Sequence, residues 1–122
     1  MGTPPYKGFG IWAVGTNTWD ALAAYSSSYT EIVGPSVVLN QWTHLVETFD
    51  GTNLKLYVDG ALSASGTVTG YTLNTGGPLL IGATDYGSGP TEAFPGLIDD
   101  VAVYNRTLSA TEVQLHYDSG RQ

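Results

Sequence analysis

The sequence predicts an all-β fold that ends in one short C-terminal helix. Three observations support this prediction: apolar residues alternate along several short segments, turn residues separate those segments, and the chain is rich in glycine (16 of 122 residues) and low in charge (12%). Such a composition is typical of short strands joined by tight turns. Because 122 residues suffice for one hydrophobic core, we expect a single domain over residues 1–122.

The first half of the chain is predicted to form three short strands. Alternating apolar residues indicate a strand over 9–14, a second over 19–25 and a short third over 31–33. Turn residues at 15–18 and a polar stretch at 26–29 separate them.

The alternation is strongest from residue 41 onward. In the strand expected over 41–49, Glu47 falls on the same face as Leu45 and Phe49. A carboxylate among apolar neighbours is costly to bury, so we place Glu47 near a strand edge.

A hairpin is predicted directly after this strand. A turn at 50–51 leads into a strand over 54–58, whose leucines and valine share one face. Asp59 and Gly60 then form a two-residue hairpin turn, because both residues tolerate positive φ.

The last third of the chain is expected to add two strands, a short apolar one over 78–82 and another over 97–104. In the second, Val101 and Val103 share one face, and Asp99 lies in phase with them. A carboxylate that points to an apolar side must find hydrogen-bond donors or a cation.

A short helix is predicted to follow. Ser109 and Glu112 have the spacing of a capping box, and Leu108 and Val113 are placed to form a hydrophobic staple. These signals set the start of the helix.

Charge and composition exclude several kinds of partner. The net charge is −7, and the only fixed cations, Lys7, Lys55, Arg106 and Arg121, are scattered, so we expect no nucleic-acid partner. No apolar run is long enough for a membrane span, and the first residues lack a signal-peptide core, so we expect no membrane partner. The absence of cysteine leaves the compartment open.

The residue pattern does not predict an enzyme. Glycosidases need two carboxylates that flank the sugar bond, but Asp99 and Asp100 are adjacent and point to opposite faces. Glu31 and Glu47 have no acidic residue two positions away. The chain has two histidines and no Gly-x-Ser-x-Gly motif, so a serine nucleophile is not expected either.

Aromatic residues in loops are the candidate ligand-binding residues. A ring can stack on a sugar while neighbouring polar groups bind its hydroxyls. Core or interface packing is the alternative for each aromatic ring. The candidates are Trp12, Trp19, Asp20, Asp85 and Tyr86.

Four blocks in order, QWTHLVETFDG, LKLYVDGALS, PLLIGA and FPGLIDDVAVYNRTLSATEV, resemble the C-terminal half of laminin-G-like domains of the concanavalin A-like lectin/glucanase superfamily. The resemblance covers residues 41–117. It implies an antiparallel two-sheet β-sandwich of the jelly-roll type, with Trp42 in the core. It also implies an extracellular or cell-surface module that binds a carbohydrate or a protein surface.

The resemblance further implies a calcium ion, with Asp99 at the position of an inward carboxylate ligand. Oxygen ligands suit Ca²⁺. The alternative is that Asp99 accepts hydrogen bonds from backbone amides or a tyrosine hydroxyl.

Domains of this family usually begin with strands that precede the segment matching residues 7–14. A sandwich without those strands has unpaired edges and uncovered core. We therefore expect either a homodimer that shares or exchanges strands, or a monomer whose loops cover the gap. The homodimer makes a structural assembly role the alternative to ligand binding.

Overall fold

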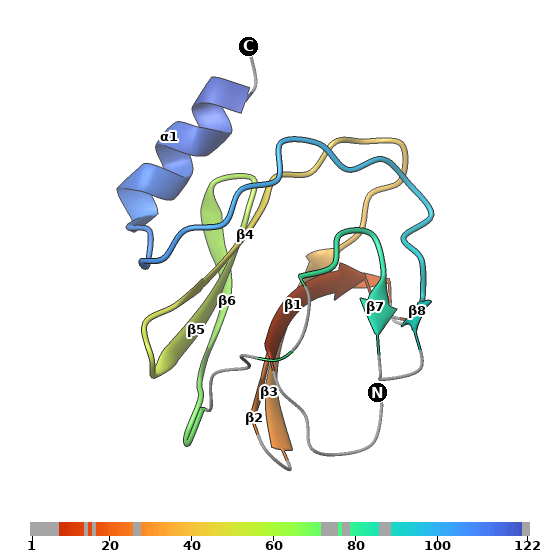
Figure 1. Ribbon diagram of the computed structural model, residues 1–122. Helices are drawn as coiled ribbons and strands as arrows, with labels where there is room; N and C mark the ends of the chain where they lie inside the picture. The colour runs from red at the N-terminus through yellow and green to blue at the C-terminus, as the bar shows by residue number, and fades with distance from the viewer. Residues whose placement is uncertain are drawn as a thin grey trace.

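The computed structural model describes residues 8–13, 15, 17–25, 28–71, 76, 79–85 and 89–120. This part of the chain forms eight strands and one helix (Figure 1). In chain order they are β1 Gly8–Ala13, β2 Thr18–Tyr25, β3 Ser28–Ser36, β4 Leu45–Phe49, β5 Asn53–Val58, β6 Ala61–Thr67, β7 Thr84–Asp85, β8 Pro90–Thr91 and α1 Ala110–Gly120.

Two antiparallel three-stranded sheets pack face to face. The first has the strand order β1-β2-β3 and the second β4-β5-β6, and the short strands β7 and β8 pair with each other. Across the sandwich, β1 contacts β4, β2 contacts β5, and β3 contacts β5 and β6. The predicted two-sheet antiparallel sandwich with one C-terminal helix is confirmed, although β3 is much longer than the strand expected over 31–33.

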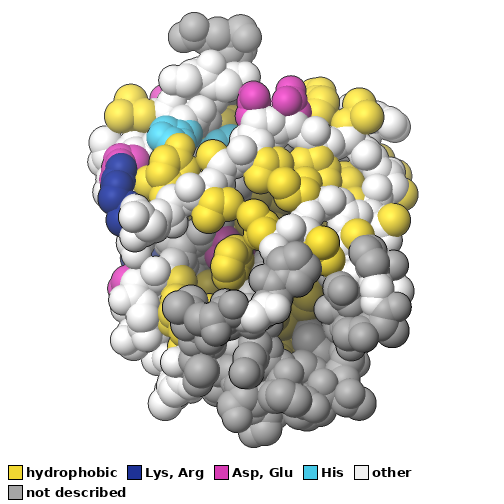
Figure 2. Space-filling model, in the orientation of Figure 1, with side chains coloured by type: hydrophobic (Ala, Val, Ile, Leu, Met, Phe, Trp, Pro, Cys, Tyr) yellow, Lys and Arg dark blue, Asp and Glu magenta, His cyan; other side chains and the backbone are white. Residues whose placement is uncertain are grey.

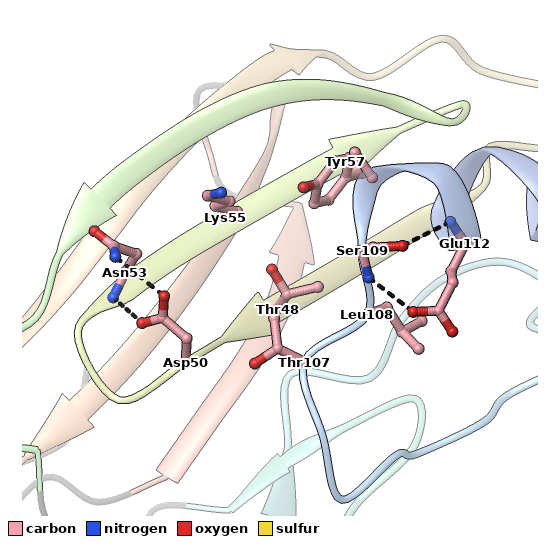
Figure 3. A pocket seen from close by; sticks show the side chains of 10 residues that line it. Thr48, Asp50, Asn53, Lys55, Tyr57, Thr107, Leu108, Ser109 and Glu112 are labelled. Atoms are coloured by element: carbon pink, nitrogen blue, oxygen red, sulfur yellow. Dashed lines mark hydrogen bonds between the residues drawn. The ribbon is translucent and has the colours of Figure 1, made fainter.

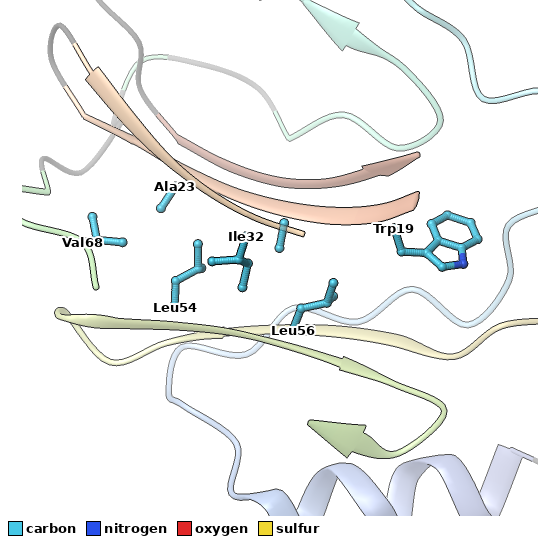
Figure 4. Close-up of a cluster of buried hydrophobic side chains, with 7 residues drawn as sticks. Trp19, Ala23, Ile32, Leu54, Leu56 and Val68 are labelled. Carbon is cyan, nitrogen blue, oxygen red and sulfur yellow. The ribbon is translucent and has the colours of Figure 1, made fainter. Parts of the chain in front are cut away.

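The core lies between the two sheets (Figure 4). Leu54 and Leu56 of the central strand β5 are completely buried there. They share one cluster with Ile32 of β3 and with Ala21 and Ala23 of β2. Each fully buried leucine is worth about 1.5–3 kcal/mol relative to an exposed one. Apolar burial along β5 therefore holds the two sheets together.

Tight turns join the strands of the second sheet where the sequence predicts them. Asp59 and Gly60 have φ angles of 51° and 83°, as a two-residue hairpin of this kind requires. At the preceding turn, the Asp50 carboxylate accepts hydrogen bonds from the backbone N–H groups of Asn53 (2.6 Å) and Thr52 (2.9 Å). These bonds, led by those from Asn53, lower the pKa of Asp50 to about 2.

Helix α1 packs on the outer face of the second sheet. The Ser109 N–H donates to Glu112 Oε1 (3.1 Å), and the Glu112 N–H donates to Ser109 Oγ (3.1 Å), which confirms the capping box. Leu108 and Val113 are buried in one cluster with Tyr57 of β5. The predicted staple pair therefore anchors the helix to the sheet.

Two predicted strands are wrong. Residues 79–82 and 97–104 belong to no strand. Asp100 adopts a left-handed φ of 53°, which interrupts the extended backbone in the middle of the second segment. Within the described part of the chain, no strand pairs with this segment. Apolar residues do alternate along this segment, but no described strand lies beside it to form a pair.

The core position expected for Trp42 is also wrong. Strand β4 begins only at Leu45, so Trp42 lies in the loop between the sheets and is 65% exposed. Val38 and Leu39 of the same loop are exposed as well. This loop presents apolar side chains at the surface.

We predict that Leu56→Ala lowers the free energy of unfolding by about 2–5 kcal/mol, because it leaves a cavity between the sheets. Urea denaturation followed by circular dichroism measures this loss. Leu62→Ala on β6 is the matched control, since Leu62 is 53% exposed and should cost less than about 1 kcal/mol. Equal losses for the two variants would contradict the assigned core.

Candidate functional site

A broad hollow lies beside β1 and β4, the edge strands on one side of the sandwich. Its volume is about 3200 Å³, and its lining includes these two strands, the loop over 37–44, the segments 79–84 and 92–108, and residues of β2 and of the end of α1. Pockets for small molecules have volumes of about 300–1,000 Å³. The hollow is therefore several times larger than one small ligand requires, and its size fits a segment of a macromolecule.

Most of the exposed large hydrophobic side chains lie at this hollow, together with polar and acidic ones. Sixteen large hydrophobic side chains of the described residues are exposed, and all of them except Tyr29, Val33, Leu62 and Leu115 line the hollow. Figure 2 shows hydrophobic side chains gathered over this face of the molecule. Soluble proteins rarely expose contiguous apolar patches of this kind unless they mark an interaction site.

Both sheets end at the hollow. β1 and β4 are the terminal strands of their sheets among the described residues. An edge strand presents a row of unpaired N–H and C=O groups, which can pair with another extended chain. The Thr107 hydroxyl donates to the C=O of Phe49 at the end of β4 (2.9 Å), so the chain that follows segment 97–104 touches this edge.

A buried carboxyl group lies on β4 at the side of the hollow. Both Oε atoms of Glu47 are buried and have no hydrogen-bond partner among the described residues. Burial raises the pKa of Glu47 to about 9, because the charged form loses its hydration. The group is therefore protonated at pH 7. The sequence placed Glu47 on the face of Leu45 and Phe49 and near a strand edge, but it did not show that the carboxyl is buried without a partner.

His44 also lines the hollow. Its Nδ1 is buried without a partner in the described residues, and its ring lies 5.8 Å from that of Tyr117. Burial and, to a smaller extent, the charge of His116 lower the pKa of His44, against the opposing effect of Asp59. His44 is therefore neutral at pH 7.

Two of the candidate ligand residues on β2 are buried. Trp19 is 9% exposed and belongs to the core cluster, so its ring is not available for stacking on a ligand. Asp20 is 2% exposed, and its Oδ1 has no partner among the described residues. Both side chains lie on β2, in agreement with the strand predicted over 19–25, and the packing of the sheets buries them.

The other candidates are not gathered into one site. Trp12 lies on β1, lines the hollow and donates from Nε1 to Glu31 Oε1 (3.3 Å). Trp12 and Asp20 are register partners across β1 and β2. Asp85 belongs to β7, but its side chain and all of Tyr86 lie outside the described residues.

Asp99 is not the inward carboxylate that the resemblance implies. Its Oδ1 accepts a hydrogen bond from the backbone N–H of Asp100 (2.8 Å), and both residues are exposed. In the described ranges, no three acidic, histidine or cysteine side chains gather closely enough to hold a metal ion. A calcium ion held mainly by backbone carbonyls stays a prediction.

A second, smaller pocket of about 310 Å³ lies between the β4–β5 turn and the start of α1 (Figure 3). Its two carboxylates already have partners: Asp50 accepts hydrogen bonds within its own turn, and Glu112 caps the helix and pairs with Arg106 (2.6 Å). The Arg106 hydrogen bonds are the main cause that lowers the pKa of Glu112 to about 2. The residues that line this pocket hold the start of helix α1 against the second sheet.

Residues 2–114 match the family described as the concanavalin A-like lectin/glucanases superfamily, and the chain belongs to this superfamily. Among solved structures it is similar to an S-layer domain-containing protein (residues 221–444) from Clostridium thermocellum ATCC 27405, with a TM-score of 0.60 and 20% identity. The match covers 82% of this chain and 51% of that one, so this chain spans about half the length of the structure it matches. A comparison with curated proteins gives no match.

Among the described residues, no helix combines the length and the apolar character needed to cross a bilayer.

We predict that Glu47→Gln changes how stability depends on pH. The raised pKa means that the folded protein binds more protons than the unfolded chain between about pH 4.5 and 9, so wild-type stability falls as pH rises through this range. Glutamine does not titrate. The stability of the variant relative to wild type should therefore increase by about 1.4 kcal/mol per pH unit. Urea denaturation at pH 5, 6, 7 and 8 measures the slope, and a difference that does not vary with pH would contradict a buried, unpartnered carboxyl.

Proposed function

We propose that this chain is a non-catalytic binding module that recognises a polypeptide partner through the hollow beside β1 and β4. The gathering of exposed apolar side chains around this hollow carries the proposal. The fold neighbour is an S-layer domain-containing protein, and we propose a comparable extracellular setting for this chain.

The residues at the hollow support a binding role rather than catalysis. Glu47 has no acidic residue two positions away on its strand, whereas glycosidases use a pair of carboxylates. His44 has no neighbouring Gly-x-Ser-x-Gly motif in the sequence that would supply an activated serine.

Glycan recognition is the second candidate, and Trp42 favours it. Its ring is 65% exposed at the hollow, and the side chains of Asn40 and Gln41 beside it are exposed too. An exposed indole next to amide groups can stack on a sugar ring and bind its hydroxyls. The amount of apolar lining beyond Trp42 favours the polypeptide.

We immobilise the chain and select peptides that bind it from a displayed random library. We predict that the selected peptides bind at the hollow. Val103→Glu should weaken their binding at least about tenfold, because a charge replaces an apolar contact. Val33→Glu is the matched control, since Val33 is 61% exposed on β3 and Val103 is 62% exposed. Fluorescence anisotropy with labelled peptides measures the affinities.

A glycan array probed with wild type and Trp42→Ala runs in parallel. The proposal requires selected peptides whose binding is weakened by Val103→Glu and not by Val33→Glu. Glycan binding that is lost in Trp42→Ala, without any selected peptide, would establish the second candidate instead.

A further inference from the structure

We infer that the partner enters the hollow as an extended apolar strand that carries a basic side chain to the carboxyl of Glu47. This inference rests on the proposed function and adds the chemistry of the partner. Four features of the described residues support it: two sheet edges, exposed hydrophobic side chains, an acidic surround and an unpartnered carboxyl.

The sheet edges favour an extended partner. The terminal strands of both sheets, β1 and β4, border the hollow. A peptide that adds to such an edge gains main-chain hydrogen bonds for affinity, while alternate side chains enter pockets for specificity. Segment 97–104, which lines the same hollow and belongs to no strand, offers further backbone groups for pairing.

Exposed hydrophobic side chains at the hollow favour apolar residues on the partner. The exposed hydrophobic residues around the hollow include Leu39, Trp42 and Leu97, which are 75%, 65% and 79% exposed. Twelve large hydrophobic side chains of the described residues are exposed at the hollow, and a peptide that adds to a sheet edge places alternate side chains against such a surface. A strand with apolar residues at alternate positions could cover this surface.

The charges around the hollow favour a basic partner. Its described lining contains one Arg or Lys, Arg106, and this side chain is already paired with Glu112. Besides Glu47, whose carboxyl is protonated at pH 7, the acidic lining residues are Asp50, Asp59, Glu92, Asp99 and Asp100. Electrostatic complementarity therefore selects lysine or arginine on the incoming strand.

Glu47 gives that basic side chain a specific position. Its two buried oxygens have no partner among the described residues, and a buried polar group without a partner costs about 1–3 kcal/mol. A lysine ammonium would let the carboxyl ionise and would satisfy its oxygens. Tyr71 interacts electrostatically with Glu47, and because burial and that interaction raise the pKa of Tyr71, its phenol stays neutral at pH 7.

A second copy of this chain fits the hollow less well. Each copy has a net charge of −7, and its four Lys and Arg residues are scattered along the sequence. Two acidic surfaces brought together repel each other. We therefore assign the hollow to a different polypeptide.

The test uses two synthetic ten-residue peptides of alternating valine and threonine, identical except for a central lysine or norleucine. Isothermal titration calorimetry at pH 7, in two buffers of different ionisation enthalpy, measures affinity and proton release. We expect wild type to bind the lysine peptide at least about tenfold more tightly and to release nearly one proton per peptide, because Glu47 ionises on pairing.

Glu47→Gln should bind both peptides equally and release no proton, whereas Glu31→Gln on β3 should behave as wild type. Thermal unfolding by circular dichroism checks that both variants fold. Equal affinity of wild type for the two peptides, or a lysine preference that survives in Glu47→Gln, would overturn the inference.

Light scattering that gives a dimer at micromolar concentration before peptide is added would also overturn the inference, since a second copy would then fill the hollow. A further outcome is that neither designed peptide binds, while selected peptides still bind in a way that Val103→Glu weakens. That result would refute the extended strand with a basic side chain and leave the proposed function standing.

Discussion

The burial of Leu54 and Leu56 between the two sheets is the contact on which the rest of the structure depends. The chain has no cysteine, so no disulfide assists the fold. A three-stranded sheet needs an apolar face packed against another layer to be stable, and β5 supplies that face at the centre of the second sheet. Its opposite face carries Tyr57, on which Leu108 and Val113 anchor the helix. One strand thus joins all three layers.

The packing around β5 closes one side of the sandwich and leaves the other open. β3 lies against β5 and β6, whereas β1 and β4 border the hollow. The chain belongs to the concanavalin A-like lectin/glucanases superfamily, yet it spans about half the length of the solved structure it resembles. Most of the exposed large hydrophobic side chains of the described residues lie at the hollow. One physical cause, an apolar face that no other described element packs against, accounts for three features. These are the exposed side chains at the hollow, segment 97–104, which belongs to no strand, and the carboxyl of Glu47, which lacks a hydrogen-bond donor among the described residues.

The features that the sequence predicts correctly are local. The turn at Asp59 and Gly60 needs only residues that tolerate positive φ, and the helix cap needs only Ser109 and its partner three residues later. Segment 97–104 has the alternation of a strand, but a strand forms only when another strand pairs with it, and the sequence does not reveal that partner. The candidate site shows the same limit: alternation placed Glu47 on the face of Leu45 and Phe49, while the burial of its carboxyl without a partner and the burial of Trp19 depend on how the sheets meet.

Amide hydrogen exchange on the 122-residue chain alone, resolved by residue with NMR, tests the central claim most directly. If the sandwich is held by β5 and open at the hollow, the amides of Leu54 and Leu56 should exchange only through global unfolding, at least about a thousandfold more slowly than in an unstructured peptide. The amides of residues 98–104 should exchange within about tenfold of the unstructured rate. Equal protection of the two regions would show that segment 97–104 is paired and the hollow closed, and would contradict the account.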